Sequence, residues 1–375
     1  MNVLAVVGTR PEAIKMAPLI NRLKTVDNIR SAVCITSQHR EMVAPILALF
    51  GIEEDFNLDI MTPDQSLSDI ASAVLSGMDR VLTEFRPELV LVQGDTNTAF
   101  ATSLAAYYRQ IPVGHIEAGL RTGSMYEPWP EEGNRKMIGA LASIHFAPTE
   151  QARQNLVAEN IKTSAIHVTG NTVIDALLSV SCRIEDDANL NASLRERFPY
   201  LREASKLVLI TAHRRENFGE GLRKICIAIR RLSERFPDVD FVYPVHPNPN
   251  VKVPVQRDLA DLKNVSLVAP QDYLPFVWLM KRASLIITDS GGIQEEAFSL
   301  GRPVLLMRDV TERPEGVHQG GVILVGTNEG SITQEATSFI NEEVGFTPLQ
   351  NAPNPYGDGN AAARIVETIC SCFKA

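Results

Sequence analysis

Cysteine is scarce and scattered in this 375-residue sequence, which contains only five. None of the five has the spacing of a zinc motif, and Cys370 and Cys372, one residue apart, form a poor chelate by themselves. This pattern argues against a disulfide framework and against a metal site. We therefore expect reduced thiols, no bound metal and a cytoplasmic location.

Long apolar runs and an excess of basic residues are also lacking. No apolar run reaches the ~18 residues of a membrane-spanning helix, and the first residues, MNVLAVVGTRPEAIKM, lack the basic lead of a secretory signal. The net charge of -9 argues against a nucleic-acid partner. An anionic ligand would have to be bound locally, against the overall field of the protein.

Two nucleotide-binding patterns are missing as well. The sequence has no G-x-x-x-x-G-K-[ST] loop, which argues against an ATPase. GDGNAA (357–362) matches a loose dinucleotide pattern, but it follows NAPNP and not a strand. We therefore expect no nicotinamide cofactor.

The sequence does contain a regular alternation of short Val-, Ile- and Leu-rich runs with segments of helical spacing. Strands that are apolar on both faces and separated by helices predict parallel sheets covered by helices. About six such strands occur in each half, which favours an α/β fold with two doubly wound Rossmann-like domains. We place these domains at 1–170 and 171–355, and we expect the C-terminal helix within 356–375 to pack on the first.

Charged side chains follow several predicted strands, where doubly wound folds bind their ligands. GTRPEAIKM brings Arg10 and Lys15 to the start of a helix, a position that suits phosphate oxygens. Asp95 ends another strand, although it could simply cap the helix that begins near Thr96. Glu117 is harder to explain structurally, because Glu is not a favoured cap.

Further along, two acids and two histidines occupy similar places. Glu131 and Glu132 stand behind a proline in a first helical turn, where one of them could serve only the helix macrodipole. His213 and His246 each end a strand, and a single histidine there is more often structural. Carboxylates and histidines gathered at strand ends nevertheless favour an active site.

The most specific segment is TDSGGIQEE, which follows the strand SLII. Ser290, Gly291 and Gly292 open a helix, so that backbone N–H groups and the helix dipole face an anion. Glu295 and Glu296 would repel phosphate if both pointed inward, so we expect one to reach ribose hydroxyls. The alternative is a glycine turn that only reverses the chain.

Long motifs occur in one ordered series from the first strand to the tail: GTRPEAIKMAP, QGDT, GHIEAGLRTG, PWPEEGNR, TAHRREN, YPVHPNPN, ITDSGGIQEE and RDVTERPE. Together they closely resemble the bacterial non-hydrolysing UDP-N-acetylglucosamine 2-epimerases. The resemblance implies a GT-B arrangement of two Rossmann-like domains with the active site in the interdomain cleft. It also implies a homodimer that interconverts UDP-N-acetylglucosamine and UDP-N-acetylmannosamine for surface polysaccharide synthesis.

The chemistry of the sugar fits this resemblance. The hydrogen on carbon 2 is not acidic, because no carbonyl stands beside that carbon in the ring. Inversion therefore needs either transient oxidation of a neighbour or expulsion of a leaving group, and the missing dinucleotide pattern favours expulsion. UDP would leave carbon 1 as a proton leaves carbon 2, and it would return to the 2-acetamidoglucal after protonation of the opposite face. We expect no cofactor.

The resemblance assigns roles to three groups of residues. It assigns catalytic roles, which are proton transfer at carbon 2 and assistance to the departing UDP, to Asp95, Glu117, Glu131 and His213. UDP binding falls to Arg10, Ser290, Gly291 and Gly292 at the diphosphate with Lys15 and Arg313 nearby, Glu296 at the ribose, and Gln271 and Phe276 at the uracil. A second, regulatory UDP-N-acetylglucosamine site is implied at Gln38, Glu41, Gln65, Arg214 and His246, together with Glu131.

Three positions depart from the family pattern. Asp64 stands where some members carry Arg, and Glu41 where some carry Gln, which bears on the strength of regulation. Phe298 replaces the usual Pro, which should let its helix run straighter.

Three other functions fit parts of the pattern: a hydrolysing epimerase that releases UDP and N-acetylmannosamine, a GT-B glycosyltransferase, and a nucleotide-sugar sensor without turnover. The QHRE and HPNPN segments favour the non-hydrolysing enzyme, and no acceptor or membrane-docking patch supports a transferase. A sensor would not need the retained carboxylates and His213.

Overall fold

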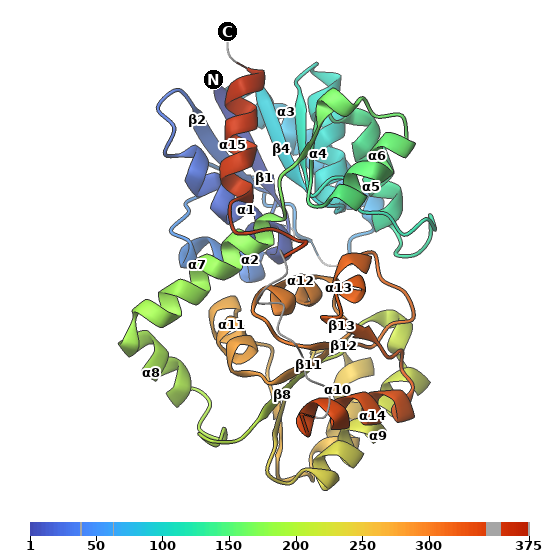
Figure 1. The fold of residues 1–375 in the computed structure, drawn as a ribbon. Helices are drawn as coiled ribbons and strands as arrows, with labels where there is room; N and C mark the ends of the chain where they lie inside the picture. Colours follow the sequence, from blue (N-terminus) through green and yellow to red (C-terminus); the bar gives the residue numbers. More distant parts are fainter. Residues whose placement is uncertain (38–39, 63, 343–353, 374–375) are drawn as a thin grey trace. The chain divides into compact units, whose positions relative to one another are not determined.

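The structure is a computed structural model that describes residues 1–37, 40–62, 64–342 and 354–373 (Figure 1). The chain forms two compact units, Met1–Ala176 with Pro355–Ala375 (unit 1) and Leu177–Asn354 (unit 2). The division falls inside helix α7 (Thr172–Asp186), whereas the sequence suggested a boundary just before this helix. No helix among the described residues is both long and apolar enough to cross a membrane.

Unit 1 contains a parallel seven-stranded sheet in the order β3-β2-β1-β4-β5-β6-β7. The strand order reverses direction between β1 and β4, which is the switch point where ligands bind in such sheets. The strands are β1 (Asn2–Val7), β2 (Arg30–Ile35), β3 (Phe56–Asn57), β4 (Leu89–Gln93), β5 (Val113–Ile116), β6 (Ile144–Ala147) and β7 (Ile166–Val168). The helices are α1 (Arg10–Leu23), α2 (Arg40–Leu49), α3 (Leu67–Phe85), α4 (Asn97–Tyr108), α5 (Glu131–Leu141), α6 (Glu150–Ala158), the 3-10 turn η1 (Thr163–Ala165), the first part of α7, and α15 (Ala361–Cys372).

Unit 2 contains a parallel six-stranded sheet in the order β10-β9-β8-β11-β12-β13, with its switch point between β8 and β11. The strands are β8 (Leu207–Thr211), β9 (Asp240–Pro244), β10 (Val265–Val268), β11 (Leu285–Thr288), β12 (Val304–Leu306) and β13 (Val322–Leu324). The helices are α8 (Ala188–Glu196), the 3-10 turn η2 (Arg215–Asn217), α9 (Glu220–Arg235), α10 (Pro249–Leu259), α11 (Tyr273–Arg282), α12 (Gly291–Ser299), α13 (Pro314–His318) and α14 (Glu329–Ile340).

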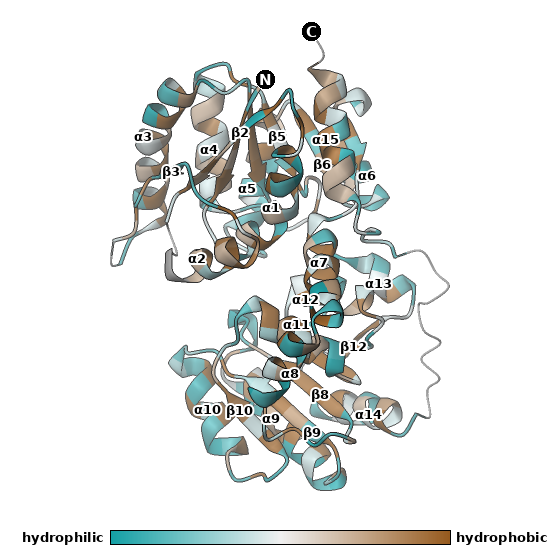
Figure 2. Cartoon of the chain, turned by 90° about the vertical axis from the view of Figure 1, so that its left-hand side faces the viewer, coloured by the Kyte–Doolittle hydropathy of each residue, from teal (hydrophilic) through white to brown (hydrophobic). Residues whose placement is uncertain are grey.

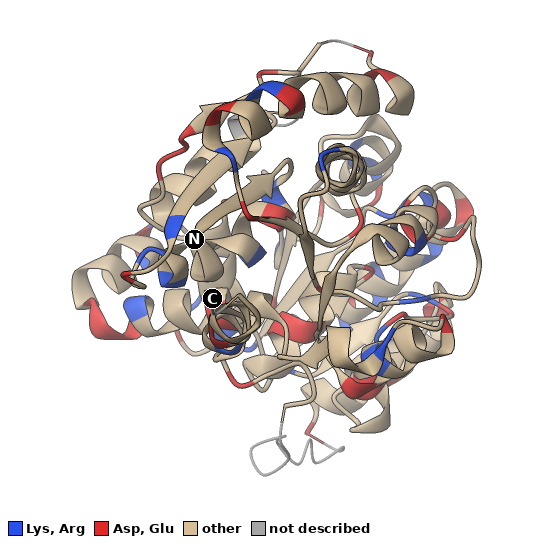
Figure 3. Cartoon of the chain, turned by 90° about the horizontal axis from the view of Figure 1, so that it is seen from above, with Lys and Arg blue, Asp and Glu red and all other residues tan. Residues whose placement is uncertain are grey.

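Burial explains why these runs form central strands. Every residue of β4 and of β8 is buried, since helices cover both faces of each sheet. In Figure 2, the strands β8 and β9 are mainly brown, which marks hydrophobic residues, whereas helix α10 carries hydrophilic residues in teal. Figure 3 shows most of the charged residues on helices and loops. Each fully buried Val, Leu or Ile contributes roughly 1.5–3 kcal/mol. The predicted α/β fold class with two doubly wound sheets is confirmed.

The end of the chain returns to unit 1. Helix α15 packs against α1 (Figure 1), and the Asp175 carboxylate accepts the N–H groups of Ala361 and Ala362 at 3.2 and 2.8 Å. Gly170 and Gly357 approach so closely that a Cβ on Gly170 would lie 3.2 Å from the Cα of Gly357. The tail thus lies beside the loop that precedes α7.

Candidate active site

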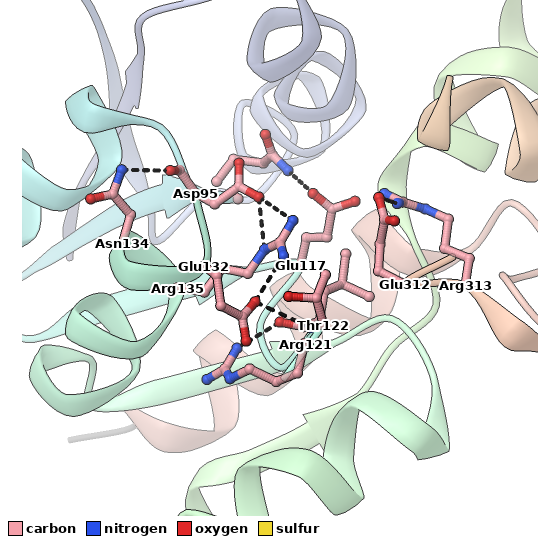
Figure 4. Close-up of polar contacts among 12 residues, drawn as sticks. Asp95, Glu117, Arg121, Thr122, Glu132, Asn134, Arg135, Glu312 and Arg313 are labelled. Carbon is pink, nitrogen blue, oxygen red and sulfur yellow. Dashed lines mark hydrogen bonds and ion pairs between the residues drawn. The ribbon is translucent and has the colours of Figure 1, made fainter. Parts of the chain in front are cut away.

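The turn after β4 presents Asp95 to a cation. Thr96 is the N-cap of α4, since its hydroxyl accepts the N–H of Ala99 at 3.0 Å. The Asp95 carboxylate instead accepts from Arg135 Nε at 2.8 Å, and its backbone carbonyl accepts from Asn134 Nδ2 at 2.9 Å (Figure 4). The helix-cap alternative for Asp95 is therefore wrong, and its carboxylate pairs with Arg135 instead.

Helix α5 separates the roles of the two adjacent glutamates. Glu132 is fully buried and accepts from Arg135 at 3.0 Å and from the N–H of Thr122 at 3.2 Å, so it is a structural anchor. Glu131 is the first residue of the helix, and its buried Oε2 has no hydrogen-bond partner in the described part of the chain. Of the two, Glu131 is the carboxylate with an oxygen left for a ligand.

Glu117 lies at the end of β5 in a strained conformation, with a φ of 63° in the left-handed region. Lys15 Nζ donates to both of its oxygens at 2.6 and 2.7 Å, Asn171 Nδ2 donates at 2.9 Å, and Gln93 Nε2 donates as well. Only 5% of the Glu117 side chain is exposed. Charge-assisted hydrogen bonds therefore fix the orientation of the Glu117 side chain and hold Lys15 beside it.

Glu12 ties two loops of unit 1 together. Its carboxylate accepts the N–H groups of Gly8 and Thr9 at 3.0 and 2.6 Å and the Thr96 hydroxyl at 2.6 Å. Burial raises the pKa of Glu12, although these hydrogen bonds oppose the increase. Glu12 thereby fixes the start of α1, where Arg10 lies, next to the turn that carries Asp95.

His115 contacts the turn after β4 that carries Gly94 and Asp95. Its Nε2 lies 2.7 Å from the carbonyl oxygen of Gly94, which can only accept, so Nε2 carries the proton. Burial lowers the pKa of His115 to about 3. Its neutral imidazole is thus a structural support for Gly94, whose φ of 70° turns the chain toward Asp95.

In unit 2, the predicted phosphate cradle forms the start of α12. Ser290 is the N-cap, and its hydroxyl accepts no capping hydrogen bond from the described first turn, while its N–H donates to Thr288 Oγ1 at 3.0 Å. A Cβ on Gly291 would lie 2.7 Å from Arg313 and 2.8 Å from Glu312, so only glycine fits there. No atom of the described residues lies within 4 Å of a Cβ built on Gly292, so this position is open where Gly291 is not.

A buried cluster of arginines and glutamates lies behind this cradle. Arg313 pairs with Glu312 at 2.5 Å (Figure 4). Arg313 also pairs with Glu295, and Arg308 pairs with Glu312 at 2.8 Å. Burial acts to raise the pKa of Glu312, but Arg313 and Arg308 outweigh it and hold that pKa well below its usual range. Glu295 is therefore part of an internal ion-pair network.

Glu296 points to a different neighbour. Its carboxylate accepts from the Tyr273 hydroxyl at 2.8 Å, which links α12 to the start of α11. Gln271 lies just before α11 and its amide donates to the carbonyl of Ala269 at 2.6 Å, while half-buried Phe276 belongs to the first turn of α11. The three residues predicted to hold uracil and ribose thus belong to two elements joined by the Tyr273–Glu296 hydrogen bond.

His213 follows β8 and lies against Asp289. The Asp289 carboxylate accepts the backbone N–H groups of His213 and Arg214, both at 2.8 Å. The His213 ring stacks on the ring of His246, with centroids 5.6 Å apart and an interplanar angle of 14°. The structure therefore brings His213, Arg214 and His246 together at one end of the unit 2 sheet.

The other predicted regulatory residues belong to unit 1. Gln38 lies outside the described residues, and for Glu41 only its place in α2 is described. Gln65 donates to the carbonyl of Ile60 at 2.7 Å and accepts from the N–H of Thr62 at 3.1 Å. Their assignment to a regulatory site stays a prediction.

Several residues that organise the site were missed by the sequence analysis: Glu12, Gln93, Arg135, Asn171 and Asp289. Glu12, Gln93, Arg135 and Asp289 stand inside the motifs GTRPEAIKMAP, QGDT, PWPEEGNR and ITDSGGIQEE, which is the one signal that could have found them, whereas Asn171 lies outside these motifs. Their contacts depend on which strands are neighbours, and that information appears only in the folded chain.

The fold and these side chains define an α/β enzyme of two Rossmann-like units, with carboxylates at the strand ends of one and a helix that opens on two glycines in the other. A sequence model of the family described as UDP-N-acetylglucosamine 2-epimerase matches residues 21–370. The chain belongs to the UDP-N-acetylglucosamine 2-epimerase family.

Individual relatives agree over nearly the whole length. The chain is 54% identical to a probable UDP-N-acetylglucosamine 2-epimerase of Ralstonia nicotianae, over 99% of both proteins. It is 53% identical to the UDP-N-acetylglucosamine 2-epimerase of Escherichia coli strain K12, over 98% of both. The crystal structure of UDP-GlcNAc 2-epimerase from Neisseria meningitidis bound to UDP-GlcNAc matches with a TM-score of 0.95 and 51% identity, over 99% of this chain and 100% of that one.

Proposed function

We propose that the protein is a non-hydrolysing UDP-N-acetylglucosamine 2-epimerase that interconverts UDP-N-acetylglucosamine and UDP-N-acetylmannosamine. The observation that carries the proposal is the full-length match to the Neisseria meningitidis enzyme with bound UDP-GlcNAc. The four side chains assigned a catalytic role each have different polar neighbours among the described residues: Asp95, Glu117, Glu131 and His213.

UDP is the group that unit 2 is proposed to hold. The N–H groups of Gly291 and Gly292 and the hydroxyl of Ser290 would bind the diphosphate at the start of α12, where the helix dipole favours negative charge. Glu296 would accept from ribose hydroxyls, and Gln271 and Phe276 would contact uracil. Cations assigned to the diphosphate are Arg10, Lys15 and Arg313, of which Lys15 and Arg313 already neutralise carboxylates.

Proton transfer at carbon 2 is assigned to unit 1. A group that exchanges protons with the sugar needs an available oxygen. This favours Glu131, whose Oε2 has no hydrogen-bond partner among the described residues, and Asp95, whose Oδ2 carries its contact to Arg135. Glu117 is saturated by donors, so its charge would fix Lys15 and stabilise the transition state electrostatically. The three carboxylates therefore have different proposed roles: Glu131 and Asp95 exchange protons with the sugar, and Glu117 acts through its charge.

The reaction would proceed by elimination and re-addition. The bond from carbon 1 to the diphosphate oxygen breaks as a carboxylate removes the proton of carbon 2, which gives 2-acetamidoglucal and UDP. A carboxylic acid then protonates carbon 2 from the opposite face while the diphosphate oxygen re-forms the bond to carbon 1. His213 would stabilise the negative charge of the departing UDP.

Phosphorus NMR during turnover tests the proposal against hydrolysis. Starting from either UDP-sugar, we expect the same final mixture of two UDP-sugars, with the diphosphate ester signals retained. Accumulation of UDP in proportion to time would identify a hydrolysing enzyme, and an unchanged spectrum would contradict any epimerase activity.

Three further properties belong to the proposal. The chain would act as a cytoplasmic homodimer, its product would feed polysaccharide synthesis, and a second UDP-N-acetylglucosamine would bind as a regulator. The residues assigned to that second site are Gln38, Glu41, Gln65, Arg214 and His246. Sedimentation of the protein with and without UDP-N-acetylglucosamine, and the shape of its rate-against-substrate curve, test the first and the last.

A further inference from the structure

Asp289 is a fully buried carboxylate whose two oxygens have different surroundings. Oδ2 accepts three hydrogen bonds, from the backbone N–H groups of His213 and Arg214 at 2.8 Å and from Asn217 Nδ2 at 3.1 Å. Oδ1 has no hydrogen-bond partner among the described residues and lies 3.6 Å from Nδ1 of His213. A buried carboxylate oxygen without a hydrogen bond lowers stability, so its presence calls for a functional explanation.

The sheet of unit 2 places these residues together. Strands β8 and β11 are parallel neighbours with Thr211 opposite Thr288, so the residues that follow each strand emerge side by side at the switch point. The carbonyl of Ala212 accepts from the buried Tyr243 hydroxyl at 2.9 Å, which fixes the backbone just before His213. Asp289 and His213 are therefore neighbours by topology.

The histidine ring is restrained on a second side. His246 stacks on it nearly in parallel, and the Nδ1 of His246 accepts the N–H of Asn248 at 3.2 Å. His213 is 42% exposed, whereas Asp289 is inaccessible. Of the two ring nitrogens, Nδ1 faces the buried carboxylate, which leaves Nε2 to meet a ligand.

We propose that Asp289 is a positioning residue for His213, holding the proton on Nδ1 and presenting Nε2 to the departing diphosphate. This inference rests on the proposed function, in which His213 stabilises the charge of UDP. When the imidazole is protonated, Nδ1–H faces Asp289 and Nε2–H faces the diphosphate oxygen, so one buried negative charge offsets the imidazolium. Hydrogen bonds of this kind are often long without substrate and tighten when it binds.

The positioning role and the structural role of Asp289 use different oxygens, so a substitution separates them. In Asp289→Asn the amide oxygen can still accept the N–H groups of His213 and Arg214. Its NH₂ group then faces Nδ1 of His213 and donates to it, which moves the ring proton to Nε2. The loop stays anchored while the tautomer of His213 is reversed.

A double-mutant cycle on epimerase activity tests the inference. We expect Asp289→Asn to lower kcat on the order of a hundredfold with KM changed far less. In a His213→Gln background the same substitution should have little further effect, because Asp289 acts through His213. An equal loss of kcat in both backgrounds would overturn the inference and leave Asp289 a structural residue.

Nitrogen NMR of ¹⁵N-histidine-labelled protein gives a readout that does not depend on turnover. At pH 8 we expect the His213 signals, identified by their loss in His213→Gln, to show a protonated Nδ1 in the wild type and a protonated Nε2 in Asp289→Asn. The same tautomer in both proteins would contradict the inference. A wild-type protein without epimerase activity would instead contradict the proposed function while leaving this NMR result interpretable.

Asp240→Asn is the matched control. Asp240 is also a buried carboxylate of unit 2, and it accepts the backbone N–H of Arg202 at 2.9 Å at the start of β9. Its loss should lower stability without changing the His213 tautomer or selectively lowering kcat. A tautomer change in this control would show that general loosening of unit 2 accounts for the effect.

Discussion

At the scale of single residues, Asp95 separates two explanations that the sequence leaves equal. The structure gives the helix-capping bond to Thr96 and the cation Arg135 to Asp95. Asp95→Asn should therefore retain UDP binding, measured by calorimetry, while kcat falls on the order of a hundredfold or more. An unchanged kcat in Asp95→Asn would show that Asp95 takes no part in catalysis.

The buried Lys15–Glu117 pair predicts a stability effect. Only 12% of Lys15 and 5% of Glu117 are exposed, so Lys15→Met leaves a buried carboxylate without its cation. We expect the free energy of unfolding of unit 1 to fall by about 3 kcal/mol, and the double variant Lys15→Met/Glu117→Gln to recover part of this loss. Urea unfolding measures both.

The exposed Arg109–Asp79 pair of the same unit is the control, with 35% and 69% of its side chains exposed. Arg109→Met should cost far less, because water screens exposed pairs. Equal losses for Lys15→Met and Arg109→Met would show that burial does not strengthen the Lys15–Glu117 interaction.

At the scale of elements, the two glycines that open α12 should respond differently to alanine. A Cβ on Gly291 meets Arg313 and Glu312, which are held in an ion-pair cluster, whereas a Cβ on Gly292 meets open space. We expect Gly291→Ala to destabilise unit 2 by about 1–3 kcal/mol. Gly292→Ala should leave stability unchanged or raise it, since alanine favours the helix. Thermal unfolding of the two variants in parallel checks this difference, and equal melting temperatures would contradict it.

The elements also show what the sequence could predict. Apolar runs such as LVLVQ predicted central strands, because burial on both faces demands such residues. The glycines of SGG predicted a helix start open to an anion. The ion pairs between Asp95 and Arg135 and between Glu295 and Arg313 could not be predicted, since they depend on how separate elements pack.

At the scale of the whole molecule, two buried histidines of unit 1 make its stability depend on pH. Burial lowers the pKa of His115 from 6.5 to about 3 and that of His145 to about 4. The unfolded chain then binds protons that the folded chain does not, so stability present above pH 6.5 is lost as the pH falls. Between pH 7.5 and 5.5 each histidine should cost about 1.4 kcal/mol.

Hydrogen exchange of β5 and β6 in urea at the two pH values measures this loss, with β8 and β9 of unit 2 as internal reference. His115→Gln keeps a donor for the carbonyl of Gly94 but does not titrate, so the pH dependence of unit 1 between pH 7.5 and 5.5 should decrease by about 1.4 kcal/mol. An unchanged pH dependence in this variant would show that His115 is not responsible.

The central claim is that the proton of carbon 2 is exchanged while UDP is released and recaptured. The most direct measurement is proton NMR of UDP-N-acetylglucosamine incubated with the protein in heavy water. We expect both UDP-sugars at equilibrium, each with deuterium at carbon 2, because every passage through the glucal removes one proton and adds one from solvent. Epimerised product that retains its original hydrogen at carbon 2 would contradict the account.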